Sequence, residues 1–152
     1  MAGKIQTEIR VTRADLEAEV EAFLNIQRTA ELHIGQLTQL LRPHGLSHAQ
    51  YNVLRILRGA GDQGLPCGEI ANRMISRDPD ITRLIDRMEQ RGWVARSRSA
   101  QDRRVVTVSI LPSALETLAS LDSPVAELHK SQFALLDSAR IATLVALLEE
   151  LR

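Results

Sequence analysis

The segment from residue 78 to residue 111 constrains the fold more than any other part of the chain, because it predicts one helix followed directly by a β-hairpin. Asp78 is a favourable N-cap, Pro79 suits the first helical position, and Gly92 provides a stop. Between them, apolar side chains recur at the spacing of one helix face, at Ile81, Leu84, Ile85 and Met88. The other face is polar and carries Asp80, Thr82, Arg83, Asp86, Arg87 and Gln90. The helix is therefore amphipathic, with one face for a core and one for solvent or a partner.

A basic hairpin is predicted immediately after this helix. Residues 93–98 and residues 105–110 have the composition of strands. The turn between them places Asp102, Arg103 and Arg104 at the base of the returning strand. An α-helix fits the DNA major groove, and a cationic loop suits the narrower minor groove. The segment therefore predicts a helix and a wing that bind double-stranded DNA.

Two shorter helices are predicted before this segment. Ser47 and Gln50 form a capping-box pattern that opens the first of them. The second is expected over residues 67–74, and a turn at residues 75–77 then leads into the helix at Asp78. Two helices joined by so short a turn predict a helix-turn-helix, to which the hairpin adds a wing.

Long amphipathic helices are predicted at both ends of the chain. Over residues 12–43, apolar side chains alternate in steps of four and three, as in a coiled coil. Over residues 113–152, Pro124 is expected to kink or interrupt the helix, and Asp137 can cap a final helix. A winged core of residues 47–111 does not need the apolar faces of these terminal helices to form its own hydrophobic core. We therefore expect these faces to pack together and against a second copy.

Chain length favours a single folding unit. The 152 residues are enough for one well-buried domain and too few for two of ordinary size. The predicted fold class is mainly α with a small β-hairpin, in one domain over residues 1–152. A winged helix-turn-helix core over residues 47–111 would bind DNA, and long N- and C-terminal helices over residues 12–43 and 113–152 would form the dimerisation region.

The charges are unevenly distributed although the formal net charge is zero. Residues 47–111 contain eleven arginines, no lysine and seven acidic residues, so this segment carries four net positive charges. The rest of the chain carries four net negative charges. A basic middle between acidic ends is expected when one part faces phosphate and the rest faces a partner or solvent.

Composition also bears on location and on enzyme activity. Cys67 is the single cysteine, which excludes an intrachain disulfide and is compatible with a reducing cytoplasm. No apolar run has the length of a signal-peptide core or of a membrane span, so we expect a cytoplasmic protein without a membrane partner. The sequence has no nucleophile–base pair at a useful spacing, Gly-rich phosphate loop or metal motif, so we do not expect an enzyme.

The order of these elements resembles the multiple-antibiotic-resistance regulator (MarR) family of bacterial winged-helix transcription factors. The resemblance covers essentially the whole chain and is strongest in ITRLIDRMEQRGWV at residues 81–94 and QDRRVVTVSIL at residues 101–111. It implies an obligate homodimer with intertwined terminal helices, a recognition helix in the major groove and wing arginines in the minor groove. Many members of this family respond to small phenolic or other lipophilic ligands bound between the two regions.

The expected function is sequence-specific regulation of transcription, most simply repression. A homodimer would bind a palindromic operator in double-stranded DNA, and a small lipophilic or phenolic effector would relieve binding. The candidate DNA-binding residues lie on the turn, the polar helix face and the wing, and are Ser76, Arg77, Asp80, Thr82, Arg83, Arg87, Arg98, Arg103 and Arg104. Which of Arg103 and Arg104 enters the minor groove is left open. The sequence does not identify ligand-binding residues.

Some of these residues have simpler interpretations. Arg83 and Arg87 can be solvated side chains paired with neighbours on the same helix. Asp102 is expected to organise the wing, because a carboxylate repels phosphate but can hold an arginine through a charge-assisted hydrogen bond. Phe23, Tyr51 and Trp93 can line a ligand cavity, although Trp93 at a strand start is more typical of a core. A winged helix that binds proteins and not DNA is a further alternative, and the arginines on both helix and wing argue against it.

Redox or metal sensing is the alternative function within the same fold. Cys67 lies at a predicted helix start, where the pKa of a thiol is lowered. The sensing cysteine of the family belongs to the first helix, where this chain has none, so a small near-buried residue is the preferred interpretation. The four histidines are His33, His44, His48 and His129, and the break after His44 misaligns the one pair that is four residues apart. No metal and no cofactor are expected.

Overall fold

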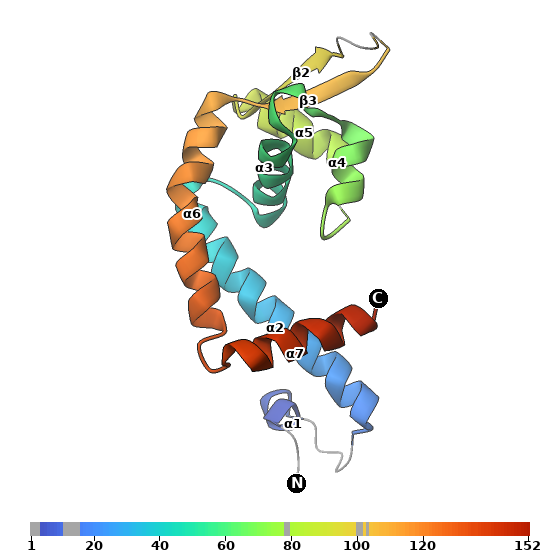
Figure 1. Ribbon diagram of the computed structural model, residues 1–152, viewed down its shortest axis with the longest axis vertical. Coiled ribbons are helices and arrows are strands. Elements are labelled where there is room, and N and C mark those ends of the chain that lie inside the picture. The colour runs from blue at the N-terminus through green and yellow to red at the C-terminus, as the bar shows by residue number, and fades with distance from the viewer. Residues whose placement is uncertain (1–3, 11–15, 78–79, 100–101, 103) are drawn as a thin grey trace.

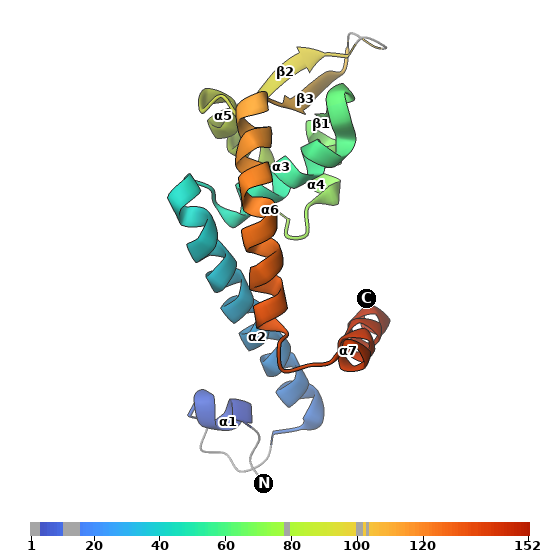
Figure 2. The ribbon, with the colours of Figure 1, turned by 60° about the vertical axis from the view of Figure 1, so that its left-hand side comes forward.

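Two long helices form a stalk that carries the winged core at one end. The computed structural model describes residues 4–10, 16–77, 80–99, 102 and 104–152. In it α2 (Ala18–Leu41) and α6 (Pro112–Gln132) run side by side (Figure 1). Helix α1 (Lys4–Glu8) lies at the far end of the stalk, and α7 (Ser138–Glu150) turns away from the end of α6, as the rotated view also shows (Figure 2).

The winged core combines three helices with a small antiparallel sheet. Its elements are α3 (His48–Ala60), β1 (Leu65–Pro66), α4 (Cys67–Arg73), α5 (Ile81–Gln90), β2 (Val94–Arg98) and β3 (Val106–Ile110). Short 3₁₀ turns, η1 (Arg42–His44) and η2 (Gly61–Gln63), precede and follow α3. The strands lie in the order β1-β3-β2, and Arg96 of β2 is opposite Val108 of β3. The predicted mainly helical fold, helix-turn-helix and hairpin are confirmed, whereas the third strand, β1, was not predicted.

Helix α3 lies at the centre of the hydrophobic core. Its Val53, Leu54 and Leu57 are fully buried. Helix α5 packs its predicted apolar face into the same cluster through Leu84, Ile85 and Met88. The stalk and sheet complete the cluster with Leu37, Leu41, Val94, Val108, Ala114, Leu118, Leu121 and Val125. Because full burial of one such side chain contributes about 1.5–3 kcal/mol, this cluster is what fixes the orientation of α5.

Local signals set the two ends of α5. Its first residue is Ile81 and its N-cap is Asp80, whose side chain accepts a hydrogen bond from the Arg83 backbone N–H at 3.3 Å. The predicted start at Asp78 is therefore two residues too early, and Asp78 and Pro79 themselves lie outside the described residues. At the other end Gly92 has φ +71° and donates to the Glu89 carbonyl. The Gly92 stop is thus confirmed as a left-handed helix terminus.

The prediction that Pro124 interrupts the C-terminal region is wrong. Helix α6 runs from Pro112 through Pro124 to Gln132. A proline inside a helix costs about 3 kcal/mol, because it removes one backbone hydrogen bond and crowds the preceding turn. Leu121, about one turn before Pro124, and Leu118, nearly two turns before it, are fully buried, and Val125 is buried directly after it. Continued burial of this face on α2 and α3 offsets the local cost.

The N-terminal region differs from the single long helix that was expected. Helix α2 begins at Ala18, and its N-cap Glu17 makes no side-chain capping hydrogen bond. A separate short helix, α1, was not predicted, and it buries Ile5 and Gln6. Residues 11–15 of the predicted helix lie outside the described residues. Across the described part of the chain, no helix combines the length and apolar character required to span a membrane.

The capping box of α3 gives a direct test of the fold. The Ser47 hydroxyl accepts from the Gln50 N–H at 3.1 Å, and the Gln50 side chain accepts from the Ser47 N–H at 2.9 Å. We expect Ser47→Ala to lower the free energy of unfolding by about 1 kcal/mol, and Ser47→Gly by only a few tenths. Urea denaturation at one fixed protein concentration measures both. Equal stability of Ser47→Ala and the wild type would contradict a role for the cap.

Candidate nucleic-acid interface

The polar face of α5 presents exposed side chains opposite its buried face. Thr82, Arg83 and Arg87 are exposed. The Arg83 Nε lies 3.1 Å from a carboxylate oxygen of Asp80, and the other Asp80 oxygen accepts the Arg83 backbone N–H. Asp80 was expected to bind DNA, but its observed contacts are those of a helix cap and of an ion-pair partner. At this exposure the pair contributes little to stability and leaves Arg83 available to another anion.

A side chain of α3 fixes the turn before α5. The Asn52 carboxamide oxygen accepts a hydrogen bond from the Ile75 N–H at 3.2 Å. Ser76 and Arg77 follow and are exposed. A side-chain acceptor therefore replaces a helical partner for this N–H and fixes the path of the turn. The two candidate residues on the turn are in this way placed next to the start of α5.

Hydrogen bonds to Asp102 organise the base of the wing. The Asp102 carboxylate accepts from the Arg104 backbone N–H at 2.9 Å, and the Asp102 carbonyl accepts from the Val105 N–H at 2.9 Å. The Ser99 N–H donates to the Val105 carbonyl at 2.8 Å across the turn. The sequence suggested that Asp102 holds an arginine side chain, whereas this contact is with the backbone of Arg104. Arg98 and Arg104 are exposed, and Arg103 lies outside the described residues.

Arg96 joins the wing to α5 and was missed by the sequence reasoning. Its two terminal nitrogens lie 2.6 Å from Glu89 and 2.6 Å from Asp86. Partial burial acts to lower the pKa of Arg96. The hydrogen bonds that Arg96 donates to Asp86 and Glu89 outweigh this effect, so the pKa is raised. The sequence feature that could have predicted this contact is the pair Asp86 and Glu89, three residues apart on one helix, followed by an arginine in the next strand.

Arg91 connects the end of α5 to the end of the stalk. It donates to the Gly45 carbonyl at 2.6 Å, and its guanidinium carbon lies 4.3 Å from the centre of the Trp93 ring. Gly45 has φ +67°, and a Cβ there would lie 2.7 Å from an Arg91 nitrogen. The left-handed conformation favours glycine at this position, and a side chain there would displace the Arg91 guanidinium. The contact gives a polar link between the turn that follows α2 and the end of α5.

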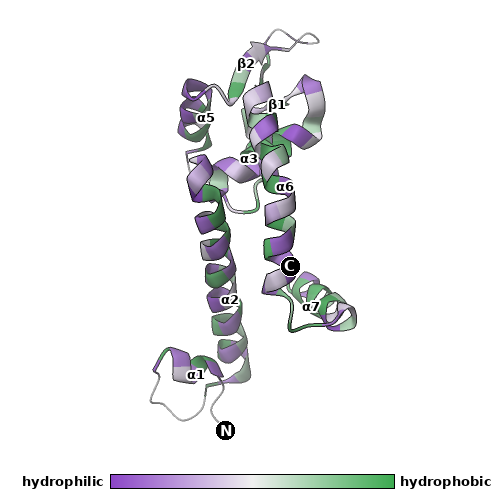
Figure 3. Ribbon diagram, turned by 90° about the vertical axis from the view of Figure 1, so that its left-hand side faces the viewer, coloured by the Kyte–Doolittle hydropathy of each residue, from purple (hydrophilic) through white to green (hydrophobic). Residues whose placement is uncertain are grey.

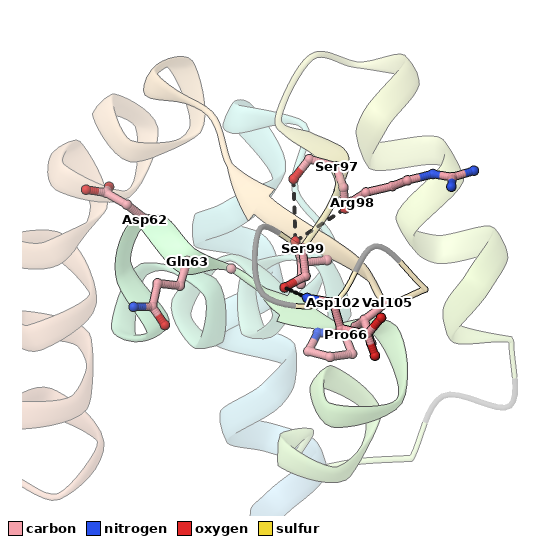
Figure 4. Close-up of a pocket in the computed structure, with 10 residues that line it drawn as sticks. Asp62, Gln63, Pro66, Ser97, Arg98, Ser99, Asp102 and Val105 are labelled. Carbon is pink, nitrogen blue, oxygen red and sulfur yellow. Dashed lines mark hydrogen bonds between the residues drawn. The ribbon is translucent and has the colours of Figure 1, made fainter.

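An open pocket of about 540 Å³, with both polar and apolar lining, lies between the wing and the segment that follows α3. It is lined by Asp62, Gln63, Gly64, Pro66, Ser97, Arg98, Ser99, Asp102, Val105 and Thr107. Figure 4 shows the Arg98 side chain directed away from Ser99 and Asp102. Phe23, Tyr51 and Trp93 are not among the residues that line this pocket. Tyr51 is buried in the core, whereas Phe23 is exposed.

Three of the candidate sensing residues, Cys67, His33 and His129, lie on α4, α2 and α6. Cys67 is half-buried at the start of α4. The His33 ring packs edge-on against Phe133 at 5.3 Å, and His129 bonds with Gln132. In the parts of the chain that the structure describes, no three His, Cys, Asp or Glu side chains are grouped to hold a metal ion.

Comparisons with known proteins identify the family. The model of the MarR family matches residues 46–106. A MarR transcription factor from Planctomyces limnophilus is 36% identical, with a TM-score of 0.67 over 90% of this chain and 98% of that chain. The chain belongs to the MarR family. The match to the Planctomyces protein extends the similarity from the winged core to the stalk.

Two other similar proteins bear on function. An Escherichia coli MarR mutant complexed with operator DNA is 25% identical, with a TM-score of 0.79 over 91% of this chain and 99% of that chain. The Bacillus subtilis regulator MhqR is 28% identical over 62% of this chain. The chain spans 63% of the length of MhqR, and 47% and 45% of the next two curated relatives. These relatives are named as transcriptional regulators and not as enzymes.

Proposed function

We propose that this MarR-family protein binds double-stranded DNA sequence-specifically and regulates transcription, as a repressor on a palindromic operator. The observation that carries the proposal is the set of exposed arginines on α5 and on the adjacent wing, Arg83, Arg87, Arg98 and Arg104. Binding of operator DNA by the Escherichia coli MarR mutant, which has a similar fold, supports it. Such a regulator would act in the cytoplasm, where bacterial DNA lies.

The proposed contacts follow from position and charge. Residues 47–111 would form the DNA-binding region. Thr82, Arg83 and Arg87 on α5 would lie in the major groove, with Ser76 and Arg77 at phosphates beside it. Arg98, Arg103 and Arg104 would bind the minor groove and its phosphates. Asp80 and Asp102 would contribute indirectly, Asp80 by capping α5 and Asp102 by shaping the wing.

We infer a homodimer from the apolar side chains that one chain leaves uncovered. Helix α7 has no buried residue, although most of its side chains are apolar. Figure 3 shows hydrophobic residues over α7 and along α2, in contrast to the more hydrophilic α5. The exposed large apolar residues of these regions are Val20, Phe23, Ile26, Leu32, Ile34, Leu135, Val145, Leu147 and Leu151. A second copy that covers both helices, within residues 12–43 and 113–152, accounts for this surface.

We further propose that a small lipophilic or phenolic effector relieves DNA binding. The support is the resemblance to family members that bind such ligands between the terminal helices and the winged core. An effector can act only by favouring a dimer in which the distance between the two recognition helices mismatches the half-sites. Those half-sites would lie about one helical turn, roughly 10 bp, apart. The Arg91–Gly45 contact lies on the route between the two regions.

The wing arginine gives the first test. We expect Arg104→Ala to weaken binding of the operator by about 1–3 kcal/mol per subunit, because one charged DNA contact is lost. Fluorescence titration with a duplex selected from a random DNA pool measures the change. Lys4→Ala removes an exposed cation of α1, outside the proposed DNA-binding and dimerisation regions, and is the control that should bind as the wild type does. A folded Arg104→Ala protein of unchanged affinity would move the contact elsewhere, and a wild type without DNA binding would favour the protein-binding alternative.

The assembly gives a second test. We expect the wild type to sediment at twice the 16.9 kDa chain mass. Phe23→Glu and Leu147→Glu should shift it to the mass of one chain, because the charges would lie in the interface. Their side chains are 63% and 55% exposed in a single chain, so helicity should not change. Ile75→Glu, at an 83% exposed residue outside the stalk, is the control that should remain dimeric. A wild type that stays monomeric at micromolar concentration would contradict the dimer.

Regulation gives a third test, by calorimetry of salicylate with and without operator DNA. Coupling of about 1–3 kcal/mol would be typical, and it must be reciprocal. We therefore expect the operator to weaken salicylate binding by the same factor that salicylate weakens operator binding. Heats that are absent, or identical in the two titrations, would exclude this class of effector.

A further inference from the structure

We propose that Arg96 is a positioning residue that makes the wing and the recognition helix bind DNA as one rigid unit. This inference rests on the proposed DNA-binding function and names a residue that would not itself contact DNA.

Arg96 binds two carboxylates that lie on one face of α5. Its Nη1 donates to Glu89 Oε2 at 2.6 Å, and its Nη2 donates to Asp86 Oδ1 at 2.6 Å. The Arg96 backbone N–H also donates to Glu89 Oε1, at 3.0 Å. Asp86 and Glu89 are three residues apart, so one planar guanidinium can reach both. With three hydrogen bonds at one residue, neither the backbone nor the side chain of Arg96 can move freely relative to α5.

The hydrogen bonds of Arg96 are the main polar link between α5 and the wing. For the part of the chain that the structure describes, every recorded side-chain hydrogen bond from α5 to β2 or β3 involves Arg96. Strand β1 supports β3 at only two positions, Val108 and Thr107. Beyond Arg96, strands β2 and β3 continue toward Asp102 and Arg104 as a hydrogen-bonded pair, and β3 also contacts η2, α3 and α4. Arg96 is therefore the polar contact through which α5 influences the angle at which Arg104 leaves the core.

The three groups are also partly withdrawn from solvent. The Arg96 side chain is only 26% exposed, whereas Asp86 and Glu89 are 46% and 39% exposed. Ion pairs between fully exposed side chains contribute little to stability. Because the contact of Arg96 with Asp86 and Glu89 is hydrogen-bonded and partly buried, its contribution is larger. The contact also offsets one of the two negative charges that α5 would otherwise hold near phosphate. A test must therefore separate the geometric role of Arg96 from a purely electrostatic one.

Two sets of substitutions break the contact with opposite changes of charge. Arg96→Met removes one positive charge, and Asp86→Ala combined with Glu89→Ala removes two negative charges. Each full-length protein is titrated with two duplexes made from the selected operator. The long duplex includes the flanking base pairs that the wings would reach, and the short duplex ends before them. The measured quantity is the ratio of the two dissociation constants.

A positioning role predicts the same change in both variants. For the wild type we expect the long duplex to bind at least about tenfold more tightly than the short one. In both variants this ratio should fall close to one, as it should in Arg104→Ala, while binding of the short duplex persists. Arg58→Met is the matched control, because Arg58 makes a similar two-bond contact with Asp122, at 2.9 Å and 2.9 Å, away from the wing. Its ratio should equal that of the wild type.

Other outcomes would overturn the proposal. If the two variants shift affinity in opposite directions while both keep the wild-type ratio, the role of Arg96 is electrostatic only. A ratio retained in either variant, or a wild-type ratio near one, would also contradict it. If Arg96→Met does not fold, the double alanine variant decides the question alone. Failure of the wild type to bind either duplex would instead refute the proposed function itself.

Discussion

The rest of the structure depends on the way α5 buries one face against α3. Leu84, Ile85 and Met88 lie in the same core cluster as the fully buried residues of α3, so α5 cannot rotate without exposing them. A rotation by one residue, about 100°, would also turn Arg83 and Arg87 away from the exposed side. The apolar contact thus determines which polar side chains are presented. Contacts of Asn52, Arg96 and Arg91 then place the turn, the wing and the stalk relative to this helix.

Local signals in the sequence predicted most of the fold. The capping pair Ser47 and Gln50, the Gly92 stop and the Asp137 cap were all correctly assigned, because each depends on residues within one turn of the chain. Pro124 was assigned wrongly because its local cost is offset by burial against helices distant in sequence. Strand β1 was missed for a similar reason, since its two residues are ordered by pairing with β3.

The sequence predicted which side chains of the candidate interface are exposed, but not the hydrogen bonds that position them. Periodicity placed Thr82, Arg83 and Arg87 on the polar face, where the structure also has them. A wing-organising role was expected for Asp102, but its partner, the Arg104 backbone N–H, was not, and neither was the capping of α5 by Asp80, because both depend on individual backbone N–H groups. Arg96 and Arg91 were missed because their partners are fixed by the packing of the hairpin and stalk on α5.

The division of charge between the winged core and the rest of the chain gives the molecule an electric dipole. The net charge is zero, yet the basic segment lies at one end of the stalk. Near a polyanion such a molecule experiences a torque that turns its basic end forward, over roughly the Debye length of about 8 Å at physiological salt. Added salt would weaken this long-range orientation at lower concentrations than it weakens direct contacts between charged groups. With an isoelectric point near 6.9, copies also lack mutual repulsion at neutral pH, which favours self-association and lowers solubility.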